Sequence, residues 1–230
     1  MKDEKYFNFP IQLLSGFMNN TSKTLNNISY YALYRNLLEL EYGTELEKIN
    51  ESASFYGLSL GNSKKALSDG KELYNSIPRN SPRVGISTVM FWDFCNNEKT
   101  EFDKICLLGF LGIKSIIGSK AYCKTGNLFW LSRMDGKVNK VNDASELSDE
   151  VRKYANEYQT KKIKTALRNG WALVTYSRHC YGFYVSFKIT LKQLMTEAEK
   201  RRISTKEKQY KQQEKDLLKE VLNELKATRP

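Results

Sequence analysis

Residues 158–189 change periodicity part-way along, and this change constrains the fold more than any other feature of the 230-residue chain. Over residues 158–168 apolar side chains recur at helical spacing, whereas after Gly170 apolar and polar residues alternate. The first pattern predicts an α-helix, with Thr160 as its N-cap and Asn169 with Gly170 at its end. The second predicts β-strands, so a helix is expected to lead directly into a small sheet.

The predicted helix has one basic and one apolar face. On a wheel that advances about 100° per residue, the polar residues near Lys161 fall within about 60° of it. They are Lys164, Thr165 and Arg168. The apolar residues Ile163, Ala166 and Leu167 fall on the far side, at about 140° to 240°. Such a helix is expected to pack on its apolar face and to present its lysines, including Lys162, outward.

The alternating stretch predicts two strands, 171–177 and 183–189, joined as a hairpin. The second strand has one apolar side, formed by Phe183, Val185, Phe187 and Ile189. Gly182, in the linker, suits a backbone angle that other residues rarely adopt. The linker also carries Arg178, His179 and Tyr181, which are expected at the hairpin tip.

The positive charge of the chain lies in its last third. Residues 1–157 hold 20 Lys and Arg against 19 Asp and Glu, a net charge of +1, whereas residues 158–230 hold 17 against 7, a net charge of +10. This asymmetry favours a polyanionic partner for the C-terminal region, either nucleic acid or an anionic membrane surface.

The N-terminal part is predicted to be helical. Residues 25–42 place apolar side chains at helical spacing, and residues 45–77 show a helix, a turn and a second helix capped by Asn62 or Ser63. Pro78 and Pro82 then mark an expected boundary. The predicted domains are 1–80, with a helix-turn-helix-like hairpin, then 81–190, and a basic C-terminal helix at 191–230.

Between Ile86 and Gly118 the chain is expected to form strongly apolar core helices. A short helix at 126–134, capped by Thr125, follows, and the loop 135–144 leads to a further helix near 145–156. No strand is expected before the 126–134 helix.

The predicted C-terminal helix carries an apolar stripe at helical spacing, formed by Leu218, Val221, Leu222 and Leu225. This stripe is expected either to dock on the body or to pair with a second copy of the chain as a homodimer.

Helix, helix, basic helix and a two-stranded wing together resemble the winged helix-turn-helix family of DNA-binding domains, over residues 86–190. With the earlier hairpin, the layout is similar to that of plasmid and phage replication initiators, some of which use two such domains in tandem. The resemblance implies a mainly α fold with a small antiparallel β hairpin. It places nucleic-acid contacts at Gln159, Lys161, Lys162, Lys164, Thr165 and Arg168 in the recognition helix and at Arg178, His179 and Tyr181 in the wing. The helix at 125–134, with Lys124 and Arg133, is the rival recognition helix.

The expected function is double-stranded DNA binding, as a replication initiator or a transcriptional regulator. RNA binding and a protein-interaction role remain alternatives. Catalysis is not expected, because the chain lacks phosphate-binding loops and nucleophile elbows and has one histidine. Its four cysteines form no Cys-x-x-Cys pair, so neither a metal nor another cofactor is expected. With no apolar stretch that would span a bilayer and no secretory signal, a cytoplasmic location is expected.

Overall fold

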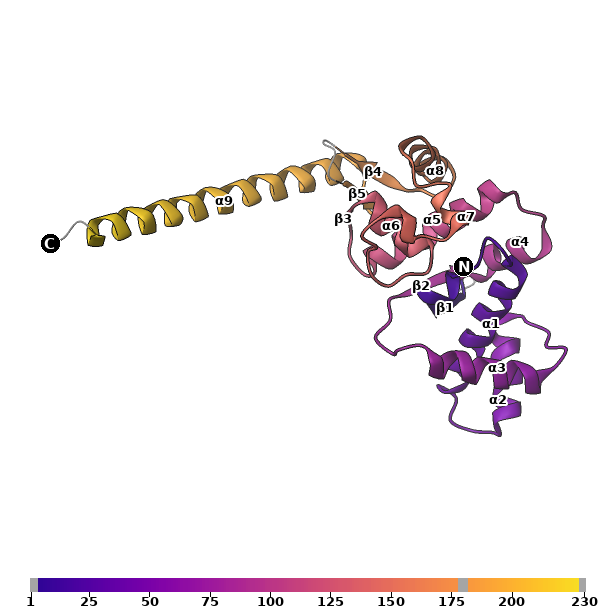
Figure 1. Cartoon of the computed structure of the whole chain (residues 1–230). Helices are drawn as coiled ribbons and strands as arrows, with labels where there is room; N and C mark the ends of the chain where they lie inside the picture. The colour runs from indigo at the N-terminus through magenta and orange to yellow at the C-terminus, as the bar shows by residue number, and fades with distance from the viewer. Residues whose placement is uncertain (1–3, 178–181, 228–230) are drawn as a thin grey trace.

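A computed structural model describes residues 4–177 and 182–227 of the chain (Figure 1). The N-terminal half contains β1 (Tyr6–Pro10), the 3-10 helix η1 (Ile11–Leu14), α1 (Thr21–Leu37), α2 (Glu45–Tyr56), α3 (Ser63–Ser76), β2 (Arg83–Ser87) and α4 (Thr88–Asn96). The C-terminal half contains α5 (Glu101–Ile117), β3 (Cys123–Thr125), α6 (Asn127–Met134), η2 (Ala144–Glu146), α7 (Asp149–Arg152), α8 (Glu157–Gly170), β4 (Val174–Tyr176), β5 (Phe183–Ser186) and α9 (Leu191–Ala227). The expected class, mainly α with small antiparallel sheets, is confirmed.

The first three helices pack against one another in the lower part of Figure 1. Helix α3 crosses α1 so closely that a Cβ at Gly70 would lie 2.6 Å from the carbonyl oxygen of Tyr30. The expected helix, turn and helix over 45–77 is confirmed as α2 and α3. Asn62 caps α3, because its side chain accepts a hydrogen bond from the backbone N–H of Lys65 at 3.0 Å.

Strands β1 and β2 form an antiparallel ribbon that the sequence analysis did not predict. Tyr6 lies opposite Ser87 and Pro10 lies opposite Arg83. The side chains on one face of the ribbon are buried; they are Phe7, Phe9, Val84 and Ile86. The ribbon thus joins the first residues of the chain to the segment that follows α3, and one core contains residues from both sides of residue 80. The domain boundary expected there remains a prediction.

The second sheet has three antiparallel strands in the order β3-β5-β4. The expected hairpin is confirmed as β4 and β5, with Val174 opposite Ser186. Strand β3 adds to the other edge of β5, with Cys123 opposite Val185. The expectation that no strand precedes the 126–134 helix is therefore wrong, since β3 lies directly before α6.

Three local expectations in the C-terminal half are corrected. The N-cap of α6 is Gly126 rather than Thr125, and it makes no side-chain capping bond. The N-cap of α8 is Asn156 rather than Thr160, and its side chain accepts from the backbone N–H of Gln159 at 2.9 Å. The single helix expected near 145–156 is instead two short turns, η2 and α7.

Helix α9 projects away from the rest of the molecule (Figure 1). Leu194 and Ala198 are buried at its base, whereas residues 200–220 are exposed. Leu218 is among them, so this member of the predicted stripe does not dock on the body; the side chains of Val221, Leu222 and Leu225 lie outside the described part. Within the described residues, α9 and the other helices are all too short or too polar to cross a bilayer.

Candidate nucleic-acid interface

Helix α8 lies directly on the main chain of α5. Its apolar residues Ile163 and Leu167 are fully buried, as expected. A Cβ at Gly109 of α5 would lie 3.1 Å from Ile163 and 3.4 Å from Leu167, so the glycine permits this close approach. Trp130 of α6 donates its indole N–H to the carbonyl of the same glycine at 2.9 Å. The position of α8 on the body is therefore set by dense packing.

The opposite face of α8 is exposed to solvent. Lys161, Thr165 and Arg168 are exposed and follow one another at helical spacing, as the wheel predicted. Among residues 4–177 and 182–227, no carboxylate oxygen lies within 4.0 Å of a cationic nitrogen of Lys161 or Arg168. Both cations are therefore available to an external anion.

Gln159 and Lys162, also predicted as contacts on α8, lie outside this exposed row. Gln159 is half-buried. Lys162 is exposed, but its ammonium lies 4.6 Å from the centre of the Phe102 ring, on the flank of α8 towards α5.

Lys164 does not project outward, and that part of the helical-wheel prediction is wrong. Its side chain is half-buried, and its ammonium donates to the side-chain oxygen of Asn127 at 2.9 Å. The ammonium lies 4.1 Å from the centre of the Phe183 ring and 5.7 Å from that of Trp130. Burial lowers the pKa of Lys164, against the opposing effect of Glu157. This lysine joins α8 to α6 and β5.

The rival recognition helix is largely buried. In α6 the residues from Trp130 to Met134 are all buried, and Arg133 is only 8% exposed. Its guanidinium lies 4.9 Å from the centre of the Phe129 ring, and its Nε and Nη1 have no hydrogen-bond partner among the described residues. Burial lowers the pKa of Arg133. Arg133 is therefore not a surface contact, and of the two candidate recognition helices α8 has the accessible basic face.

The sheet beside α8 carries a row of exposed or half-buried polar and aromatic side chains. Lys124, Tyr184 and Tyr176 lie opposite one another on β3, β5 and β4. The ammonium of Lys124 lies 5.9 Å from the centre of the Tyr184 ring. A cavity of about 410 Å³ lies at one end of this row, lined by Lys124, Thr125, Gly126, Lys140 and Gly182. Lys124 was expected only as part of the rival helix, and Lys140 lies in a loop where no sequence pattern predicts a contact.

Gly182 confirms the expected unusual backbone angle, with φ +90°. Gly182 directly precedes β5 and faces the end of β3, where a Cβ would lie 2.6 Å from the carbonyl oxygen of Thr125. The three residues expected at the tip of the wing, Arg178, His179 and Tyr181, lie outside the described residues.

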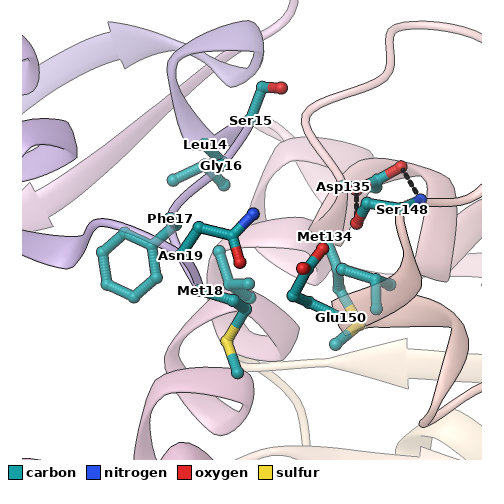
Figure 2. A pocket seen from close by; sticks show the side chains of 12 residues that line it. Leu14, Ser15, Gly16, Phe17, Met18, Asn19, Met134, Asp135, Ser148 and Glu150 are labelled. Atoms are coloured by element: carbon teal, nitrogen blue, oxygen red, sulfur yellow. Dashed lines mark hydrogen bonds between the residues drawn. The ribbon is translucent and has the colours of Figure 1, made fainter.

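A second cavity, of about 190 Å³, separates the segment 14–19 from the turns after α6 (Figure 2). Its lining includes Asp135 and Glu150 and no lysine or arginine. The Asp135 carboxylate accepts hydrogen bonds from the backbone N–H and the hydroxyl of Ser148, so it joins the end of α6 to the start of α7. This cavity does not suit a polyanion.

Cysteine and metal chemistry receive no support from the described part of the chain. Cys95, Cys106 and Cys123 are free thiols, and burial raises the pKa of Cys106 and of Cys123 to about 11. Within the described ranges, no group of three or more His, Cys, Asp or Glu side chains is placed to hold a metal ion.

Comparison of the chain with models of protein families, with curated proteins and with solved structures finds no match in any of the three.

Proposed function

We propose that this chain binds double-stranded DNA through α8 and the β4–β5 hairpin, as a winged helix-turn-helix protein that serves replication initiation or transcriptional regulation. The observation that carries the proposal is the outward row of Lys161, Thr165 and Arg168 on a helix seated beside the three-stranded sheet. A helix of about 10–12 Å diameter fits the major groove, which is about 12 Å wide.

The order of the elements supports the winged-helix assignment. Helix α5, strand β3, helices α6 and α8, and strands β4 and β5 follow one another along the chain, and β3 pairs with β5. A winged helix-turn-helix domain has this order, with its third helix as the recognition helix. The connection 135–156 between α6 and α8 is longer than a simple turn, but it packs back on the body: Val141 and Leu147 are buried, and the backbone N–H of Val141 donates to the Ser132 hydroxyl of α6 at 3.1 Å.

Charge and exposure support contact with phosphates at α8 and at the neighbouring edge of the sheet. Lys161 and Arg168 have no carboxylate partner within the described ranges. Lys124 and Lys140 line the neighbouring cavity at the edge of the sheet. A helix in the groove with cations beside it combines base contacts, which specify sequence, with phosphate contacts, which set position.

The test is binding of the full chain to a random-sequence duplex at several salt concentrations between about 50 and 200 mM, followed by fluorescence anisotropy. We expect strong, salt-sensitive binding. The variant Lys161→Ala/Arg168→Ala removes two exposed cations, so the log-log salt slope should fall in magnitude by about 1.8. The matched control Lys23→Ala/Lys64→Ala removes two exposed lysines from α1 and α3 and should leave the slope nearly unchanged.

The proposal fails if the α8 variant binds duplex as the wild type does. Equal or tighter binding to single-stranded RNA would move the assignment to RNA recognition. Absence of salt-dependent binding to any nucleic acid would favour a protein partner.

We also propose that α9 pairs with the α9 of a second copy. Ile203, Tyr210 and Leu217 are exposed at intervals of seven residues, and Leu218 is exposed beside them. A seven-residue apolar repeat suits pairing of two helices. Two copies would present two α8 helices to two half-sites of one duplex.

Light scattering of the full chain tests this pairing. The wild type should have the mass of a dimer, and Leu217→Ser/Leu218→Ser should shift it towards the monomer. The control Gln212→Ser changes an exposed polar residue on the opposite side of the same helix, so this variant should remain dimeric. A monomeric wild type at every concentration would exclude the pairing.

A further inference from the structure

A second basic site lies away from α8, on the outer face of the β1–β2 ribbon. Side chains alternate along a strand, so the residues between the buried ones face outward. Tyr6 and Asn8 do so on β1, and Arg83 and Gly85 do so on β2. A cavity of about 490 Å³, here called the ribbon pocket, lies over this face between α1 and α5.

Three cations from different parts of the chain line the ribbon pocket. Arg35 comes from α1, Arg83 from β2 and Lys114 from α5. Among residues 4–177 and 182–227, no carboxylate oxygen lies within 4.0 Å of their cationic nitrogens. Like charges that converge without a directly ion-paired carboxylate raise the local affinity for an external anion.

The Glu4 carboxylate acts on Lys114 from beside the ribbon pocket, where it is bonded to the pocket-lining Tyr6. The Glu4 carboxylate accepts a hydrogen bond from the Tyr6 hydroxyl at 2.7 Å. It favours the charged form of Lys114, but this effect is smaller than the opposing effect of burial. The pKa of Lys114 is lowered as a result. Its ammonium lies 5.3 Å from the centre of the Tyr6 ring and 4.9 Å from that of Phe110, so the rings hold the cation without neutralising it.

The floor of the ribbon pocket is kept open by a glycine. A Cβ at Gly85 would lie 2.7 Å from the side-chain oxygen of Asn8 on the opposite strand. Any larger residue would push Asn8 aside and fill part of the cavity. The absence of a side chain here leaves the Asn8 amide accessible beside the three cations.

We propose that the ribbon pocket binds a phosphate group. Guanidinium groups match the paired oxygens of phosphate, and a neighbouring ammonium adds a point charge. The cavity volume lies in the range of small-ligand sites, about 300–1,000 Å³. The phosphate belongs either to a free phosphorylated small molecule or to the backbone of a nucleic acid strand that passes over the ribbon; both present the same chemistry to the pocket.

The experiment compares the folded full chain with Arg83→Gln/Lys114→Met, in which methionine keeps the apolar stem beside the rings. The probes are inorganic phosphate and adenosine monophosphate, measured by calorimetry at constant ionic strength, and a random-sequence duplex, measured by anisotropy at several salt concentrations. The control Lys64→Met/Lys65→Met removes two exposed lysines from α3. Because Arg83 is exposed, Arg83→Gln alone is the second variant if the double variant does not fold.

If the phosphate belongs to a free molecule, inorganic phosphate or adenosine monophosphate binds the wild type. The pocket variant then binds that molecule at least tenfold more weakly, while its affinity for duplex is unchanged. If the phosphate belongs to a nucleic acid strand, the pocket variant binds duplex more weakly than the wild type does. Its salt slope for duplex binding is also smaller in magnitude, although Lys161 and Arg168 remain intact. The inference is overturned if the pocket variant and the control bind all three probes as the wild type does. This result is independent of the α8 test, which changes different residues.

Discussion

Replacement of Gly182 by alanine is expected to destabilise the β3–β5 edge of the sheet. At φ +90° an alanine is strained by about 1–2 kcal/mol. Its Cβ would lie 2.6 Å from the carbonyl oxygen of Thr125, whereas an ordinary carbon–oxygen contact is about 3.3 Å, so the strands must separate by about 0.7 Å. Thr125 pairs with the buried Phe183, and the overpacking adds about 1–3 kcal/mol.

The total loss of unfolding free energy is therefore about 2–5 kcal/mol. The assay is urea denaturation followed by tryptophan fluorescence and by circular dichroism. With a slope near 3 kcal/mol per M, the midpoint should fall by about 0.7–1.7 M.

Gly170→Ala is the matched control. Gly170 is the last residue of α8 and its φ is not positive. A Cβ added there would meet no atom within 4 Å. Its midpoint should stay near that of the wild type or rise slightly, because alanine restricts the unfolded chain. A Gly182→Ala midpoint equal to that of the control, at the same slope, would refute the reasoning.

Three other predictions follow from the packing around α8. Lys161→Met should reduce the magnitude of the salt slope of duplex binding by about 0.9, whereas Lys164→Met, which replaces a half-buried ammonium, should leave this slope nearly unchanged. An equal reduction of the slope in both variants would contradict the placement of Lys164. Trp130→Phe removes the donor to a main-chain carbonyl of α5 and should lower the unfolding free energy by about 1–3 kcal/mol in urea, while an unchanged midpoint would exclude the bond. Because burial raises the pKa of Cys106 and Cys123 to about 11, only about one thiol in a thousand is ionised at pH 8, so alkylation followed by mass spectrometry should be slow and should rise about tenfold per pH unit. The stability that these neutral thiols contribute is present below about pH 8.5 and is lost as the pH rises towards 11. Alkylation of the folded protein at the rate of an unfolded peptide would disprove the burial of these thiols.

Elements with a strong local pattern could be predicted from the sequence. The apolar spacing of Ile163 and Leu167 defines the buried side of α8, and the alternation after Gly182 defines β5. In both cases neighbouring residues carry the signal, so no distant contact is needed to read it.

Short elements that depend on distant partners could not be predicted. Strand β3 has three residues and exists because β5, about 60 residues later, supplies its hydrogen bonds. Strand β1 depends in the same way on β2. A strand has no internal hydrogen bonds, so its local sequence is a weak signal without its partner.

Whether a charged side chain is exposed or buried also depends on the tertiary structure. The wheel places Lys164 with Lys161, but Asn127 and Phe183 draw its ammonium inward. Arg133 is a charged residue on a short helix, yet it is buried. A helical wheel gives a direction from one axis and contains no information about what packs alongside.

The sequence by itself therefore determined the helical class, the basic α8, the hairpin after it and the concentration of charge in the last third of the chain, because each follows from the spacing and type of neighbouring residues. Only the tertiary structure decided which lysines remain accessible, which strands complete the two sheets, and that Arg35, Arg83 and Lys114 converge on one pocket. These features depend on residues separated by tens of positions, and their proximity is set by the packing of the shared core.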